Sequence, residues 1–139
     1  MNTDGTLDTG FAIGSGTNGI VQSITFQPDG KILIGGNFTI YNGIAKQNLV
    51  RLNSDGTIDT SFNIGGSGAN GTGSLYGIAI QPDGKIIIGG NFISYNGTAR
   101  GYIARLHSNG TLDASYATGV GANSSVYGMT LQTDGKVLI

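Results

Sequence analysis

The residues of this chain that could do chemistry are aspartates set four apart in a repeated phrase. The phrase reads DGTLD at 4–8 and DGTID at 55–59, and every acidic side chain in the sequence is an Asp. A calcium loop of the EF type also needs a bidentate Glu, and a glycosidase needs two carboxyl groups in different environments. Because the sequence has no Glu and repeats the pair, we interpret it as a turn in which Asp55 binds backbone amides.

Two glycine-rich stretches match the pattern of a dinucleotide-binding loop. They read GSGTNG at 14–19 and GSGANG at 66–71. In such a site a strand precedes the loop and a helix follows it, so that the amides of the helix hold the pyrophosphate. Here the next residues, GIVQSITF, alternate as a strand does. We therefore expect a connection between strands and no cofactor.

Few other groups in the sequence suggest catalysis. His107 is the sole histidine and there is no Cys, so neither a zinc site nor a nucleophilic triad can be assembled from visible parts. We expect His107 to lie in an exposed turn. The chain is therefore predicted to be no enzyme and to hold no metal, and the alternative left open is a polysaccharide-active enzyme.

The elements that would position these residues are repeated along the chain. FQPDGKILIGGNFTIYNG at 26–43 and IQPDGKIIIGGNFISYNG at 80–97 are identical at 14 of 18 positions. A second phrase recurs as TDGTLDTGF, SDGTIDTSF and SNGTLDASY. The spacings of these markers are 51 and 54 residues, which gives a period of about 52.

Each period predicts four short strands. In the middle of the chain these are GIAIQ, KIIIGG, YIARL and TIDTSF, which begin at 77, 85, 102 and 57. A P-D-G turn joins the first strand to the second, and a D-G turn in which Gly56 takes a positive φ precedes the fourth. The small residues Ser23, Gly77 and Gly128 suit a crowded inner strand.

We expect an all-β fold, a β-propeller-like repeat of four-stranded antiparallel blades. Blades carry apolar residues on both faces because each packs against two neighbours. The competing architecture is a β-solenoid, but its coils are usually shorter and lack a hairpin turn at each step. The phrases LNSDGTIDTSF, IAIQPDGKIIIGGNF and IARL closely resemble the delta-60 repeat. That resemblance covers essentially the whole chain and implies a propeller-type repeat of large bacterial surface, secreted or phage-associated proteins.

We interpret the chain as a single repeat array with units at 1–51, 52–105 and 106–139, the last incomplete. A closed propeller needs about four to eight blades, so two to three blades form an incomplete ring. Open blade faces would expose apolar surface and strand edges. We therefore expect the partners to be other blades of a longer chain or other copies of itself, and we favour the longer chain.

Charge and hydropathy exclude other partners. The formal charge is −1, with seven basic and eight acidic side chains, which is too balanced to hold nucleic acid through its phosphates. The apolar stretches are strand-sized, so no membrane insertion is expected. What remains is recognition of a surface glycan or protein.

Binding is expected where the residues break the repeat. Tyr76 and Tyr127 stand where the first copy has Gln22, and Arg100 stands where it has Lys46. The loop NIGGSGANGTGS at 63–74 carries the extra residues of the longer period. Two further candidates are the tyrosines of the repeated YNG phrase, Tyr41 and Tyr95. Their rings could stack on sugars or pack over the turn glycine. The sequence thus predicts a non-catalytic structural and binding module of an extracellular, cell-surface or virion assembly, or a purely architectural spacer.

Overall fold

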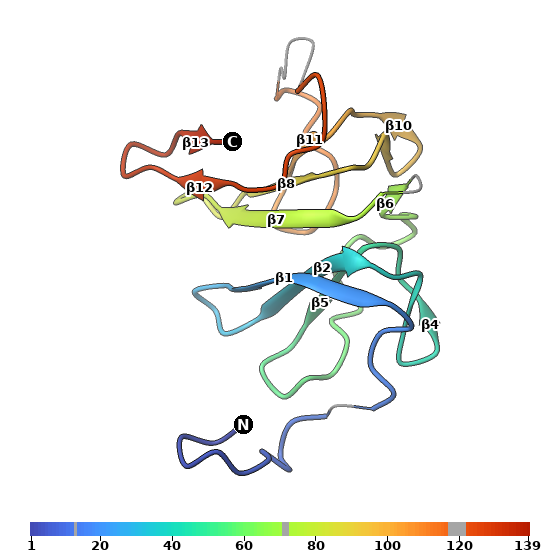
Figure 1. Ribbon diagram of the computed structural model, residues 1–139, viewed down its shortest axis with the longest axis vertical. Coiled ribbons are helices and arrows are strands. Elements are labelled where there is room, and N and C mark those ends of the chain that lie inside the picture. Colours follow the sequence, from blue (N-terminus) through green and yellow to red (C-terminus); the bar gives the residue numbers. More distant parts are fainter. Residues whose placement is uncertain (13, 71–72, 117–121) are drawn as a thin grey trace.

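The computed structural model describes residues 1–12, 14–70, 73–116 and 122–139. Within these ranges the protein is all-β, and its main sheets follow one another along the longest axis (Figure 1). The first blade contains β1 (Ile20–Phe26), β2 (Ile32–Asn37) and β5 (Leu49–Leu52). The second contains β7 (Leu75–Ile80), β8 (Ile86–Gly90) and β11 (Ile103–Leu106), and a third begins with the hairpin β12 (Thr130–Leu131) and β13 (Val137–Leu138).

Each blade is an antiparallel sheet in which the second strand lies in the middle. The order is β1-β2-β5 in the first blade and β11-β8-β7 in the second. The turn between β1 and β2 closes because Gly30 takes a φ of 82° and the amide of Lys31 donates to Asp29 Oδ1 at 3.1 Å. Every residue of β8 is buried, as expected for a strand that is covered on both faces.

Short hairpins project from the blades and were not predicted as strands. They are β3 (Ile40–Tyr41) with β4 (Ile44–Ala45), and β9 (Ser94–Tyr95) with β10 (Thr98–Ala99), which β6 (Ala69–Asn70) extends. Asn42 and Gly43 have φ angles of 47° and 77°, which makes the YNG phrase a two-residue turn with positive φ at both positions.

The predicted fourth strand is reduced to a single bridge. Ile58 bridges Leu52 in the first blade, and Leu112 bridges Leu106 in the second. The segment turns away at once because the Asp59 carboxylate accepts the amide of Ser61 at 2.9 Å. The blades are therefore three-stranded sheets with one bridging residue at the outer edge.

Glycines of one blade receive apolar side chains of the next. A Cβ at Gly35 would lie 2.5 Å from Leu75 Cδ2 and 3.2 Å from Ile78 Cδ1. One repeat later, a Cβ at Gly89 would clash with the side chains of Met129 and Val126. The repeated Gly-Gly doublet is thus explained in part by the close approach of the neighbouring blade.

A second contact links successive repeats through the D-G turns. The amide of Ala12 donates to the carbonyl of Asp55 at 2.7 Å. One repeat later, the amide of Asn63 donates to the carbonyl of Asn109 at 2.8 Å. Gly56 has the positive φ that was predicted, 86°, and a Cβ there would lie 2.8 Å from Phe11 Cε1. The segment that follows each D-G turn therefore packs on the D-G turn one repeat later.

These observations confirm an all-β fold of several small antiparallel sheets that does not close into a ring. The core lies within and between the first two blades, and the largest fully buried side chains include Leu33, Ile86 and Leu106. None of the described residues forms a helix long and apolar enough to cross a membrane.

Candidate functional site

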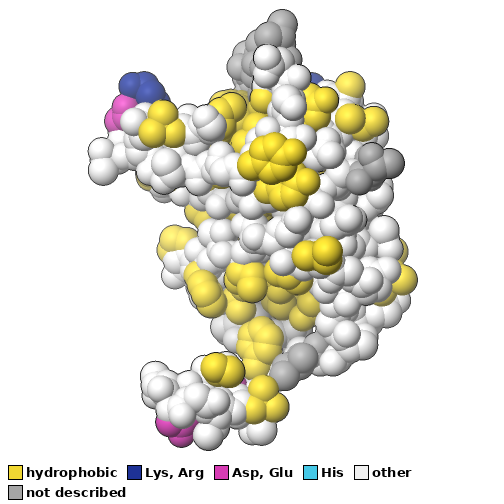
Figure 2. All heavy atoms as spheres, viewed as in Figure 1, with side chains coloured by type: hydrophobic (Ala, Val, Ile, Leu, Met, Phe, Trp, Pro, Cys, Tyr) yellow, Lys and Arg dark blue, Asp and Glu magenta, His cyan; other side chains and the backbone are white. Residues whose placement is uncertain are grey.

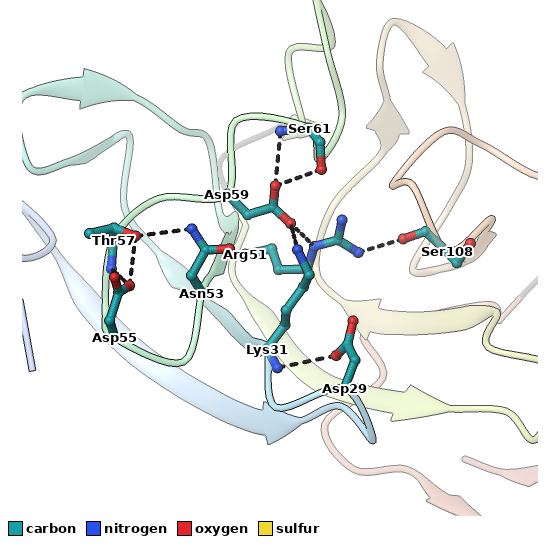
Figure 3. A network of polar contacts seen from close by, with 9 residues as sticks. All are labelled: Asp29, Lys31, Arg51, Asn53, Asp55, Thr57, Asp59, Ser61 and Ser108. Atoms are coloured by element: carbon teal, nitrogen blue, oxygen red, sulfur yellow. Dashed lines mark hydrogen bonds and ion pairs between the residues drawn. The ribbon is translucent and has the colours of Figure 1, made fainter.

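The second aspartate of the DGTID phrase lies at the centre of a buried polar network. Asp59 Oδ2 is 2.7 Å from Lys31 Nζ and 2.8 Å from Arg51 Nε, and both Asp59 and Arg51 are buried (Figure 3). The guanidinium of Arg51 also donates to the carbonyl of Ser108 and lies 4.4 Å from the centre of the Phe62 ring. Because Ser108 belongs to the second blade, the network connects two blades.

The second blade repeats this arrangement with its own residues. Arg105 Nε is 2.9 Å from Asp113 Oδ2, and its guanidinium lies 4.4 Å from the centre of the Tyr116 ring. Lys85 lies farther off, at 3.9 Å from Asp113 Oδ2, because it also contacts Asp83 at 3.0 Å. The same combination of an aspartate, an arginine and an aromatic residue therefore occurs in both blades.

The environment of these carboxylates keeps them ionised. Burial by itself raises the pKa of Asp59, but hydrogen bonds from Lys31 and Ser61 and the charge of Arg51 outweigh it and hold the pKa well below its ordinary value. Hydrogen bonds from Ser115 lower the pKa of Asp113 to about 2, with a further contribution from its arginine partner. A general acid of a glycosidase needs a raised pKa, so these groups fit structural ion pairs instead.

The first aspartate of the phrase makes the turn that was predicted. Asp55 Oδ1 accepts the amide of Thr57 at 3.0 Å and its hydroxyl at 2.6 Å, and these bonds lower the pKa of Asp55. Asn109 holds the same place in the next repeat and accepts the amide of Thr111 at 3.0 Å. Among the described residues no group of three or more His, Cys, Asp or Glu side chains is placed to hold a metal. His107 is exposed, at the start of this turn.

The glycine-rich loops use their amides within the protein. Gly16 donates its amide to Asn42 Oδ1 at 2.7 Å, and Gly68 donates to Asn96 Oδ1 at 2.8 Å. The first loop leads into β1, as the alternation of its sequence predicted. The second lies in the longer connection at 63–74, of which residues 71–72 are outside the described ranges.

The structure does not support the stacking of sugars on the repeated tyrosines. Tyr41 is 4% exposed and Tyr95 is fully buried, so neither ring offers a face to a ligand. The hydroxyl of Tyr95 donates to the carbonyl of Gly110 at 2.7 Å, and burial raises the pKa of both tyrosines. These rings fill the blade core beneath the Asn-Gly hairpins.

The symmetry-breaking tyrosines, in contrast, come together on the surface. The rings of Tyr76 and Tyr127 stack with their centres 5.0 Å apart and their planes at 28°. Tyr127 is 74% exposed, while Tyr76 is half-buried next to a bulge between Leu75 and Gly77. Arg100 is half-buried at the exit of a hairpin, where its guanidinium donates to the carbonyl of Ala99 at 2.9 Å. The tyrosine pair is therefore the most accessible of the predicted binding groups.

Sequence reasoning missed the two paired arginines and one buried asparagine. Neither Arg51 nor Arg105 was predicted to form an ion pair, although the spacing of eight residues between Arg51 and Asp59 recurs between Arg105 and Asp113. Asn48 was not singled out, yet it is buried with a φ of 61° and donates to the carbonyls of Ala69 and Gly73. The recurring spacing was a usable signal for the arginines, but the asparagine does not recur, since Tyr102 stands at the position of Asn48 in the next repeat with a φ of 66°.

Comparison with known proteins identifies the repeat. The family model described as "Domain of unknown function (DUF5122) beta-propeller" matches residues 27–62 and 81–116. No curated protein and no solved structure matches the chain. The match supports a propeller-type repeat, and the more specific resemblance to the delta-60 repeat stays a prediction. Each matched segment runs from the turn before the second strand to the aromatic residue that packs on the paired arginine, and the chain belongs to the DUF5122 β-propeller family.

Proposed function

We propose that the protein is a non-catalytic structural and binding module of a larger extracellular, cell-surface or virion-associated assembly. One observation carries the proposal: the residues of the repeated phrases are used inside the scaffold, whereas the exposed Tyr127 stands, like Tyr76, at a position where the first copy has Gln22. Asp59 and Asp113 are committed to ion pairs, and Gly35 and Gly89 to contacts between blades. Function in such repeats lies in sites added to the scaffold.

The extracellular or virion setting follows from the resemblance to the delta-60 repeat, whose members occur in large bacterial surface, secreted and phage-associated proteins. Within that setting a fibre or adhesin is the fitting kind of assembly, because an array of blades extends by adding repeats. An architectural spacer is the version of this proposal in which the surface binds nothing.

The binding part of the proposal concerns the tyrosine pair. Tyr127 presents one ring face to solvent while its other face is supported by Tyr76 at 5.0 Å. A tyrosine ring held in this way offers an apolar face with a polar hydroxyl at its edge, which suits the ring of a sugar or an exposed side chain of a protein. A neutral glycan is the ligand class that we favour.

A glycan array probed with the full chain tests this proposal. We expect retention of some glycans without release of a product, and a loss of about tenfold in affinity for Tyr127→Ala because the stacking face is removed. Tyr127→Phe keeps the face and should bind, and His107→Ala alters another exposed residue as a control. Cleavage of a polysaccharide that a single Asp substitution abolishes would contradict the proposal and favour the enzyme.

A further inference from the structure

A cavity lies between the β3-β4 hairpin of the first blade and the connection at 63–74, and we call it the hairpin cavity. Its volume is about 340 Å³, which is within the range of small-molecule sites. β4 and β6, which belong to its two sides, lie at the same edge of the molecule in Figure 1. The residues that line the cavity are Thr39, Ala45, Lys46, Gln47, Gly66 and Ser67.

Backbone contacts hold the two walls of the hairpin cavity together. The amide of Lys46 donates to the carbonyl of Thr39 at 3.0 Å, and the amide of Ala69 donates to the carbonyl of Gln47 at 3.3 Å. A Cβ at Gly68 would lie 2.4 Å from that same carbonyl oxygen, so a glycine is needed for this close approach. The connection therefore lies directly against the residues beside Lys46.

Lys46 brings a positive charge to this cavity without a counter-charge from the chain. It is half-buried, and it forms no ion pair with any residue that the structure describes. All eight acidic side chains lie within the described ranges. Figure 2 shows few charged side chains on the face that it draws, and they lie toward the two ends of the molecule. A partly desolvated cation attracts an anion more strongly than a fully hydrated one does.

Two hydroxyl groups of the cavity are set to donate hydrogen bonds. Thr39 Oγ1 accepts from Asn18 Nδ2 at 2.9 Å, and Ser67 Oγ accepts from Asn70 Nδ2 at 3.2 Å. Neither hydroxyl donates to another described residue, so the hydrogen of each can point to a ligand. The cavity thus combines one cation with neutral donors, and no carboxylate lines it.

The next repeat does not reproduce this set of donors. Ile93 stands where the first repeat has Thr39, and it is 63% exposed. Arg100 stands where the first repeat has Lys46, but its guanidinium donates to the carbonyl of Ala99 at 2.9 Å. A donor set confined to one repeat is not required by the scaffold, which makes it a candidate for binding.

We propose that the hairpin cavity binds the carboxylate of an acidic sugar, with Lys46 as the counter-charge and the hydroxyls of Thr39 and Ser67 as hydrogen-bond donors. One cation matches a group with one negative charge, whereas a phosphate monoester carries up to about two. The choice of a sugar as the carrier of the carboxylate rests on the proposed function. The cavity is a second site, because neither Tyr76 nor Tyr127 lines it.

Titration of the full chain with sodium glucuronate, followed through its backbone amide signals in NMR spectra, tests the proposal. We expect shifts of the amides that line the cavity with glucuronate and none with glucose, which lacks the carboxylate. Lys46→Gln should weaken binding by at least about tenfold, because a charge-assisted hydrogen bond is lost. Thr39→Val keeps the shape of the side chain and should weaken binding about threefold. Lys136→Gln removes a lysine whose side chain is 77% exposed and should bind as the parent does.

Several results would overturn the inference. Unchanged amide signals with glucuronate would remove the site, and equal shifts with glucose would show that the cavity does not recognise charge. Tighter binding of inorganic phosphate or sulfate would assign the cavity to those anions, and equal losses in Lys46→Gln and Lys136→Gln would reduce the effect to net charge. Tyr127→Ala should leave glucuronate binding intact, so failure here is distinguishable from failure of glycan retention at the tyrosine pair.

Discussion

At the scale of single residues, the two aspartates of the DGTID phrase have different roles although they are four positions apart. Asp55 is exposed and accepts hydrogen bonds from Thr57 in its own turn. Asp59 is 5% exposed and neutralises Arg51, which is itself buried. A buried charge left without its partner is costly, whereas a turn that keeps an amide acceptor is not.

Replacing these aspartates should therefore give unequal results. We expect Asp59→Asn to lower the free energy of unfolding by about 3 kcal/mol, because Arg51 loses its counter-charge in the interior. Asp55→Asn should stay within about 0.5 kcal/mol, since Asn109 makes the same turn naturally. Equilibrium unfolding in guanidinium chloride measures both, and equal losses would contradict the assignment.

The same aspartates should make the fold sensitive to acid. The pKa of Asp59 and that of Asp113 are lower in the folded protein than the value of about 3.9 in an unfolded chain. Groups of this kind stabilise the fold above the unfolded pKa, and the contribution is lost as the pH falls through the folded pKa. We expect the free energy of unfolding to fall between about pH 4 and pH 2, and Asp113→Asn to flatten this decline. An unchanged slope in the variant would contradict the lowered pKa.

At the scale of elements, the residue just before β5, Asn48, connects the first blade to the segment that leads to the second. It precedes β5 with a φ of 61°, accepts the amide of Phe38 at 3.1 Å and donates to the carbonyls of Ala69 and Gly73 at 2.8 Å and 3.0 Å. Its amide group thus satisfies three buried backbone groups, two of which belong to the connection toward the second blade.

Two substitutions separate the hydrogen bonds of Asn48 from its backbone conformation. Asn48→Gly keeps the positive φ but leaves the backbone groups unpaired, and we expect it to cost about 2 kcal/mol of unfolding free energy. Asn48→Ala should cost about 1 kcal/mol more, because alanine resists a positive φ. Thermal and chemical unfolding of both variants provide the comparison. A change below about 0.5 kcal/mol for Asn48→Gly would show that the bonds do not matter.

The Asn-Gly hairpins give a simpler test of turn geometry. Gly97 has a φ of 77°, and a Cβ there would meet nothing within 4 Å, so its replacement is costly through conformation alone. We expect Gly97→Ala to lower the free energy of unfolding by about 1 kcal/mol. Gly101→Ala, also in open space but without a positive φ, is the matched control and should be near neutral. Equal effects would contradict the turn assignment.

Much of the element scale could be predicted from the sequence. The positions of the glycines predict the turns at Gly30 and Gly56. The alternation of apolar and polar residues predicts the first three strands of each blade. The fourth strand could not be predicted correctly, because the side chain of Asp59 draws Ser61 into a turn that competes with the ladder. The burial of Tyr95 agrees with the alternative in which the YNG tyrosines pack over the turn glycine. The pairing of Tyr76 with Tyr127 escaped prediction, since it depends on packing between distant segments.

At the scale of the whole molecule, neighbouring blades stabilise each other. Leu75 of the second blade is fully buried against the first, and Arg51 of the first donates to the carbonyl of Ser108 in the second. In repeat proteins stability is close to a sum of contributions from single repeats and from their interfaces. Damage at one interface should therefore lower the stability of both sheets that form it.

Hydrogen exchange in a Gly35→Val variant tests this claim most directly. The added side chain would collide with Leu75, so we expect a loss of about 2 kcal/mol that appears in the β7-β8-β11 sheet as well as in the β1-β2-β5 sheet. Gly101→Val serves as the control, because a Cβ there meets nothing within 4 Å. Loss of protection in the first blade alone, or no difference between the two variants, would contradict the account.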